Sequence, residues 1–210
     1  SQVRALTTDQ LSKLTTTQIA GLSTAQVAAL STGQVAALTS VQLNAMASDD
    51  LKALTTTQVR ALTSDQLSKL SSDQVALMAT DDIAAISSAQ ISHLSTGAIG
   101  ALTTAQAKAL TTAAINALTS AQIAAIETAD LAAMSSTQLS NMGNTQVAQL
   151  TSLQVAALTT GQLKSLSSGQ VAALTSAQLN ALTSAQLPSL SSSQVRALTT
   201  DQLSKLTTTQ

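Results

Sequence analysis

The sequence predicts an all-α solenoid in which one very short helix forms in every eight-residue repeat. Residues 7–206 divide into 25 octapeptides without insertion or deletion, and we number the positions of each repeat 1 to 8. Position 1 is Ser or Thr in 21 of the 25 repeats, position 4 is Gln in 20, and position 8 is always Leu, Met or Ile. These three regularities indicate a helix start that recurs in phase along the chain.

Positions 1 and 4 carry the two halves of a helix N-terminal capping box. A Ser or Thr hydroxyl at the N-cap accepts a hydrogen bond from the backbone N–H three residues later, and the Gln there accepts one from the N-cap N–H. In Thr55–Leu62, Thr55 is the expected N-cap and Gln58 its partner. The aliphatic residues at position 8 of one repeat and position 5 of the next form a hydrophobic staple, which sets the angle at which the chain enters the helix.

A helix start every eight residues limits each helix to six or seven residues, or roughly 10 Å. Such a helix has no stability of its own, so each repeat must stack on its neighbours. Charges support the same register. Asp at position 3 favours the start of a helix through the helix dipole, and a Lys lies four residues after Asp9, Asp65 and Asp201.

A continuous helix is excluded because equivalent positions would rotate by about 80° per repeat and expose Leu on every side. The same drift excludes a heptad coiled coil. A β-solenoid stays open as the alternative, since Thr and Val suit strands. The helical prediction has two difficulties of its own. No Gly recurs at the helix ends, so the break must come from the N-cap leaving helical geometry, and Pro188 at position 6 removes a backbone donor.

The composition limits the classes of function. The chain has no Phe, Tyr, Trp or Cys, and its formal net charge is −1. We therefore expect no nucleic-acid partner, no disulfide and no thiolate metal site. No apolar stretch approaches 18 residues, so we expect no membrane insertion.

Few residues are candidates for chemistry. His93 is the only histidine, and no nucleophile or orienting partner is distinguished beside it. The pairs Asp49–Asp50 and Asp81–Asp82 could attract a divalent ion, but they lack further ligands nearby, and a compensating change in the helix cap is simpler. We expect no catalytic, cofactor-binding or metal site, no cofactor and no small-molecule substrate, and hence no enzyme.

Two further groups of residues are expected to be structural. Glu127 with Asp130 forms another variant of the cap. The four methionines all occupy position 8 and are expected to fill the core: Met46, Met78, Met134 and Met142.

Residues 1–210 are expected to form a single uninterrupted array that is a fragment of a longer repeat protein. Residues 1–18 recur without change at 193–210, an offset of 192 residues or 24 octapeptides. This identity includes the variable positions, so it indicates a super-repeat of about 24 octapeptides in the parent protein.

The octapeptide TTxQVxAL, as in Thr55–Leu62, resembles the repeat arrays of very long exported proteins of proteobacteria that are labelled haemagglutinin-like or haem-utilisation proteins. The resemblance implies an extracellular or cell-surface location and a structural role. We therefore expect a repeat segment of an extracellular fibre, filament or adhesin stalk, which self-associates into a filament or bundle. The alternative is a solenoid scaffold that binds a protein or peptide partner.

Stability of such an array should be nearly additive, because each repeat contacts only its neighbours. Chains shortened by whole octapeptides are expected to melt at progressively lower temperatures, as followed by circular dichroism. A melting temperature that does not depend on length would contradict the prediction.

Overall fold

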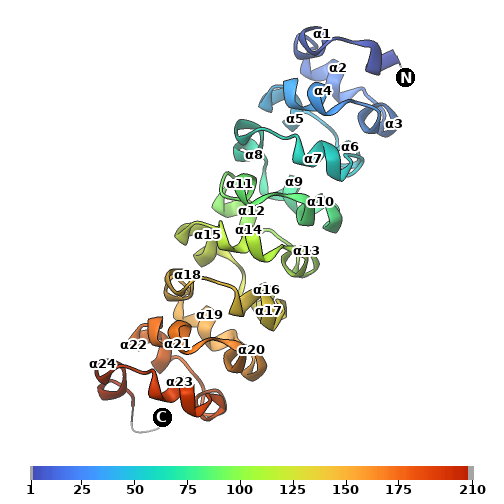
Figure 1. Ribbon diagram of the computed structural model, residues 1–210. Helices are drawn as coiled ribbons and strands as arrows, with labels where there is room; N and C mark the ends of the chain where they lie inside the picture. The colour runs from blue at the N-terminus through green and yellow to red at the C-terminus, as the bar shows by residue number, and fades with distance from the viewer. Residues whose placement is uncertain (1, 208–210) are drawn as a thin grey trace. The chain divides into compact units, whose positions relative to one another are not determined.

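The computed structural model describes residues 2–207, which form short helices separated by extended residues (Figure 1). These residues contain 24 α-helices and two 3-10 helices, with no β-strand. Every octapeptide from 7 to 206 contributes one helix. The predicted all-α repeat fold is therefore confirmed, and the β-solenoid alternative is excluded.

The chain forms two compact segments, an N-terminal segment Ser1–Leu110 and a C-terminal segment Thr111–Gln210. The helices of the N-terminal segment are η1 (Gln2–Ala5), α1 (Thr8–Ser12), α2 (Thr16–Ala20), α3 (Thr24–Ala28), α4 (Thr32–Ala37), α5 (Ser40–Asn44), α6 (Ser48–Lys52), α7 (Thr56–Arg60), α8 (Ser64–Lys69), α9 (Ser72–Leu77), α10 (Thr80–Ala85), α11 (Ser88–Ile91), α12 (Thr96–Gly100) and α13 (Thr104–Ala109). Those of the C-terminal segment are α14 (Thr112–Asn116), α15 (Ser120–Ala125), α16 (Thr128–Ala133), α17 (Ser136–Ser140), α18 (Asn144–Ala148), α19 (Ser152–Ala157), α20 (Thr160–Ser165), α21 (Ser168–Ala173), α22 (Ser176–Asn180), η2 (Leu187–Ser189), α23 (Ser192–Arg196) and α24 (Thr200–Ser204).

Each α-helix begins at position 2, directly after its N-cap at position 1. In α19, the Thr151 hydroxyl accepts a hydrogen bond from the Gln154 N–H at 3.1 Å, and the Thr151 N–H donates to Gln154 Oε1 at 2.7 Å. The same reciprocal pair caps most of the repeats that carry Ser or Thr followed by Gln, such as Thr39 with Gln42. The predicted capping box is confirmed.

Each helix ends without a left-handed residue, and no described residue has a positive φ. After α19, Leu158 has φ −61° and ψ 139°, and Thr159, the next N-cap, has φ −70° and ψ 156°. Two consecutive extended residues thus separate the helices, in agreement with the expectation that no Gly is needed. The α-helices have four to six residues, so the longest of them reach the predicted length of six or seven and the others are shorter. In a five-residue helix such as α3, the N–H at position 7 bonds three residues back, from Ala29 to the Gln26 carbonyl at 3.2 Å, so the α-helical pattern ends one residue earlier.

Burial follows the octapeptide. Positions 1 to 3 are exposed or half-buried, whereas most of the aliphatic side chains at positions 5 and 8 and most of the Gln side chains at position 4 are buried. The four methionines lie in this core, as predicted. None of the described helices is long or apolar enough to cross a membrane.

Within each segment, a helix packs against the helix three repeats further along the chain (Figure 1). Examples in the N-terminal segment are α1 with α4 and α10 with α13, and in the C-terminal segment α16 with α19 and α18 with α21. Each segment is therefore a solenoid in which successive turns lie against one another.

Pro188 changes the local helix type but not the repeat. Its octapeptide forms the 3-10 helix η2 in place of an α-helix, because proline has no N–H to donate to the preceding turn. Thr183 and Gln186 still form the reciprocal cap, at 2.7 Å and 3.3 Å. The predicted loss of a donor is thus absorbed within a single repeat.

Candidate functional site: the glutamine ladder

The side-chain amide of the position-4 Gln joins two helices that are far apart in the sequence. Oε1 of Gln154 accepts from the Thr151 N–H at 2.7 Å, at the start of its own helix. Its Nε2 donates to the carbonyls of Ile123 and Ile126, both at 2.8 Å. These carbonyls belong to positions 5 and 8 of the octapeptide four repeats earlier, where a helix ends. One amide therefore caps the beginning of one helix and the end of another.

The same arrangement recurs in both segments. We call glutamine ladder the set of position-4 Gln residues whose Nε2 donates to backbone carbonyls 28 to 31 residues earlier. Its members include Gln34, Gln42, Gln58, Gln66, Gln90, Gln106, Gln146, Gln154, Gln162, Gln170, Gln178, Gln186, Gln194 and Gln202.

The ladder sets how many repeats make one turn. Helices pack against the third helix along, while the Gln side chains reach back to the fourth. A turn of the solenoid therefore contains between three and four octapeptides. The sequence alone did not reveal this number, because nothing in an unbroken octapeptide pattern states which repeats meet.

The ladder solves a problem that short helices create. The last four carbonyls of any α-helix have no intrahelical partner, and in a helix of five residues these are nearly all of its carbonyls. Gln154 is only 2% exposed, so its own amide would be costly to bury without partners. Each bond satisfies two buried groups at once and contributes about 1 kcal/mol. No buried side-chain nitrogen or oxygen among residues 2–207 lacks a hydrogen-bond partner.

The sequence prediction identified the cap but missed the ladder. A capping box accepts Glu as readily as Gln, and the helix dipole favours the charged residue. Position 4 nevertheless carries 20 Gln and no Glu. A carboxylate cannot donate a hydrogen bond to a carbonyl, so this strict preference was the available signal.

Some repeats replace this Gln by Asp or Ala. Asp82, at position 4 of α10, is buried, and burial raises the pKa of its carboxyl, with a further increase from the neighbouring Asp81. A backbone hydrogen bond from Ala79, the N-cap, acts in the opposite direction on this pKa. Asp82 thus still accepts the hydrogen bond from the N-cap, as a Gln at position 4 does. It has no side-chain N–H to donate to the carbonyls of Leu51 and Leu54, which a Gln in this position would reach.

The other residues singled out in the sequence lie apart from one another. His93, Asp49 and Asp81 are exposed, whereas Asp50 is buried at position 4 of α6. Glu127 is the exposed N-cap of α16, and its side chain makes no cap hydrogen bond. The buried Asp130 takes position 4 of the same repeat. Within residues 2–207, no three His, Cys, Asp or Glu side chains come together as a metal site.

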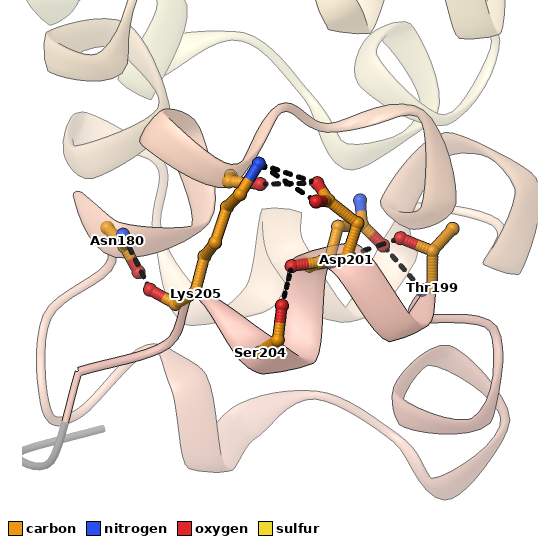
Figure 2. A network of polar contacts seen from close by, with 7 residues as sticks. Asn180, Thr199, Asp201, Ser204 and Lys205 are labelled. Atoms are coloured by element: carbon orange, nitrogen blue, oxygen red, sulfur yellow. Dashed lines mark hydrogen bonds and ion pairs between the residues drawn. The ribbon is translucent and has the colours of Figure 1, made fainter.

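An exposed polar network links α22 to α24 on the surface of the C-terminal segment (Figure 2). Lys205 Nζ lies 2.8 Å from Asp201 Oδ1, and this contact lowers the pKa of Asp201. From α22, Ser176 Oγ donates to Asp201 Oδ2 at 3.3 Å, and Asn180 Nδ2 donates to the Lys205 carbonyl at 3.0 Å. The hydrogen bond from an Asn side chain to a Lys carbonyl recurs in the N-terminal segment, where Asn44 Nδ2 donates to the Lys69 carbonyl at 2.9 Å.

Of the three predicted Asp–Lys pairs four residues apart, only Asp201–Lys205 forms an ion pair in the part of the chain that the structure describes. Asp9–Lys13 and Asp65–Lys69 do not, because exposed ion pairs gain too little to hold both long side chains in one geometry.

A small interior void marks a gap in the ladder. It has a volume of about 10 Å³ and is lined by residues that include Leu43, Leu54, Gln74 and Met78. Gln74 caps Ser71 at 2.9 Å, but its Nε2 does not donate to Leu43 or Met46 in the described structure. A void of this size holds at most one water, so we interpret it as a packing fault and not as a ligand pocket.

The ladder predicts that bridging Gln residues tolerate Glu poorly. Gln154→Glu keeps the cap acceptor but turns a buried carboxylate towards two carbonyls, so we expect a loss of about 2–4 kcal/mol in the free energy of unfolding. Gln18→Glu is the matched control, because Gln18 is exposed and makes only the cap bonds. It should change stability by less than about 0.5 kcal/mol. Urea titrations followed by circular dichroism measure both, and equal losses would refute the bridging role.

Asp82→Gln is predicted to stabilise the chain, by about 1 kcal/mol for the restored bridge. The raised pKa adds a pH dependence: ionised Asp82 destabilises the folded state in full above its raised pKa, and not at all below the ordinary value of 3.8. The advantage of Asp82→Gln should therefore shrink as the pH falls through this window. Asp65→Gln, at an exposed position 3, serves as the control in the same titrations. An advantage that grows on acidification would show that the interpretation is wrong.

The comparison with known families supports a tandem repeat array. A family model described as the ALTTAQ repeat matches residues 3–40, 16–48, 43–80, 75–112, 123–160, 160–192 and 176–208, in tandem along the chain. None of the curated proteins matches the sequence. Because these matches cover residues 3–112 and 123–208, the chain belongs to the ALTTAQ repeat family.

Proposed function

We propose that the chain is a structural repeat segment of an extracellular fibre, filament or adhesin stalk, and that it self-associates. The observation that carries this proposal is the ladder. The contact between turns uses one type of side chain and the backbone carbonyls of an earlier turn, as in Gln154 with Ile123 and Ile126. A contact of this kind works equally well at every turn, so an array can be extended without redesign.

The exposed surface supports a mechanical role over a chemical one. Positions 1 to 3, which face solvent, carry mostly Ser, Thr and Ala with scattered Asp. Charged side chains make up 9% of the chain, and there is no aromatic residue. Binding surfaces concentrate their energy in clusters of aromatic and Arg residues. The alternative role, a scaffold for a protein or peptide partner, therefore has less support.

The proposed location rests on the resemblance of the octapeptide to arrays in exported haemagglutinin-like proteins. A near-neutral surface rich in hydroxyls is compatible with display outside the cell. We propose that no catalytic step takes place in the array and that its function depends on its length.

Immunogold electron microscopy tests the proposal on cells that produce the parent protein. Antibodies raised against residues 1–210 should label filaments outside the cell, and pre-immune serum should not. Purified arrays of different length should keep one width, and each added turn should lengthen them by about one helix–helix distance, roughly 10 Å. Label confined to a compact particle inside the cell would refute the proposal.

A further inference from the structure

One contact between turns of the N-terminal segment lacks most of its glutamine bridges. The four octapeptides of residues 71–102 follow those of residues 39–70, and their position-4 residues are Gln74, Asp82, Gln90 and Ala98. Asp and Ala have no side-chain N–H to donate, and Gln74 caps its own helix without bridging. Within the described residues, Gln90 is thus the one member of the four that bridges. We call this contact, between residues 39–70 and residues 71–102, the gapped contact.

The C-terminal segment contains a matched contact with every bridge in place. It joins residues 119–150 to residues 151–182, each 80 residues, or ten octapeptides, after its counterpart. Its four position-4 residues all donate to the earlier turn: Gln154, Gln162, Gln170 and Gln178. The two contacts therefore share one octapeptide register and differ in three of four bridges.

The missing bridges leave buried carbonyls of the gapped contact without a donor. In the ladder register, a Gln in place of Asp82 would donate to the Leu54 carbonyl. A Gln in place of Ala98 would donate to the Leu70 carbonyl. No N–H of the described residues bonds to either carbonyl, although both leucines are only 4% exposed. In the matched contact, Gln162 Nε2 donates to the equivalent carbonyl at 2.8 Å. Buried carbonyls without a donor make the closed state of the gapped contact less favourable.

The gapped contact is also imperfectly packed. The interior void of about 10 Å³ lies within it, lined by leucines of the earlier turn, such as Leu54 and Leu70, and by Gln74 and Met78 of the later turn. Side chains beside a void lose the dispersion contacts that a neighbouring atom would give. The void and the missing bridges therefore lie at the same place.

The one remaining bridge is weaker than its counterpart. Gln90 donates to its two carbonyls at 3.1 Å each, whereas Gln170 donates at 2.9 and 2.7 Å. Gln90 is half-buried, so solvent competes for its amide, and Gln170 is buried. Gln90 also belongs to α11, which has four residues and is the shortest α-helix of the described chain.

We propose that the gapped contact is a yielding point: under tension along the array, its turns separate before those of the matched contact. Local opening in a protein starts where buried contacts and hydrogen bonds are fewest. The contacts of a repeat array open nearly independently, because its stability is a sum over neighbouring repeats. The proposal rests on the fibre role proposed above and adds a mechanical property to it. The array lengthens at a fixed place under load and closes again when the load is removed.

Amide hydrogen exchange of the 210-residue chain, followed by mass spectrometry, tests the proposal without any substitution. Peptides from residues 39–102 should exchange at least about tenfold faster than peptides from residues 119–182, because three fewer bridges hold their turns together. Equal exchange in the two ranges, or faster exchange in residues 119–182, would overturn the proposal.

Two double variants test whether the bridges are the cause. Asp82→Gln with Ala98→Gln supplies the missing donors and should slow exchange in the gapped contact at least about tenfold. Gln162→Asp with Gln178→Ala makes the reverse change at the equivalent positions and should speed exchange in the matched contact by a similar factor. Circular dichroism checks that both variants are folded, and the comparison within the unchanged chain needs no variant. Exchange that neither double variant alters would overturn the assignment to the ladder.

Single-molecule force spectroscopy measures the response to load. The chain has no cysteine, so one Cys added at each end attaches it between two handles. The unchanged chain should show an opening at low force that the first double variant removes, and the second double variant should add another. Openings at low force that neither double variant alters would overturn the yielding role. These results do not depend on the location of the parent protein, which the labelling of filaments tests separately.

Discussion

A helix of four to six residues cannot satisfy its own backbone, and this constraint governs the whole structure. Nearly every carbonyl in such a helix lies within its last four residues, where no N–H follows to pair with it. In this chain the missing donors come from Gln side chains one turn later, as Gln154 provides for Ile123 and Ile126. Helix formation and stacking of turns are therefore a single event, because neither leaves its polar groups satisfied without the other.

The two atoms of the Gln side-chain amide have different roles, and these roles explain which substitutions the array tolerates. The Oε1 atom fixes a helix start, and the Nε2 atom fixes the distance between turns. Pro188 is accepted because the ladder uses the side chain of Gln186, whose bonds do not depend on the α-helical hydrogen bonds of its own repeat. Asp82 is accepted because bridges remain nearby, at Gln66 two repeats before it and at Gln90 in the next repeat, and the stability of a repeat array is a sum over neighbouring contacts.

The extent to which the sequence predicts this fold depends on the range of each interaction. The cap lies within four residues, so Thr151 and Gln154 predict it, together with the helix start and the buried positions 5 and 8. The bridge from Gln154 spans 31 residues to a backbone carbonyl, which has no side chain to mark it. The number of octapeptides in one turn depends on that bridge, so the sequence alone does not predict it. The Asp9–Lys13 spacing predicts a pairing that the structure lacks, since solvent competes successfully for exposed charges.

The direction of the ladder has a consequence for how the protein reaches its folded state. Every amide of the glutamine ladder reaches towards the N-terminus, by 28 to 31 residues. A chain that emerges N-terminus first, from a ribosome or through a secretion pore, therefore meets each partner already in place. Only the first turn of an array must form without an earlier turn to bind. Folding should therefore have an unfavourable nucleation step followed by favourable addition of turns, as in the helix–coil transition. Synthesis and folding can then proceed at the same end of the molecule, however long the array becomes.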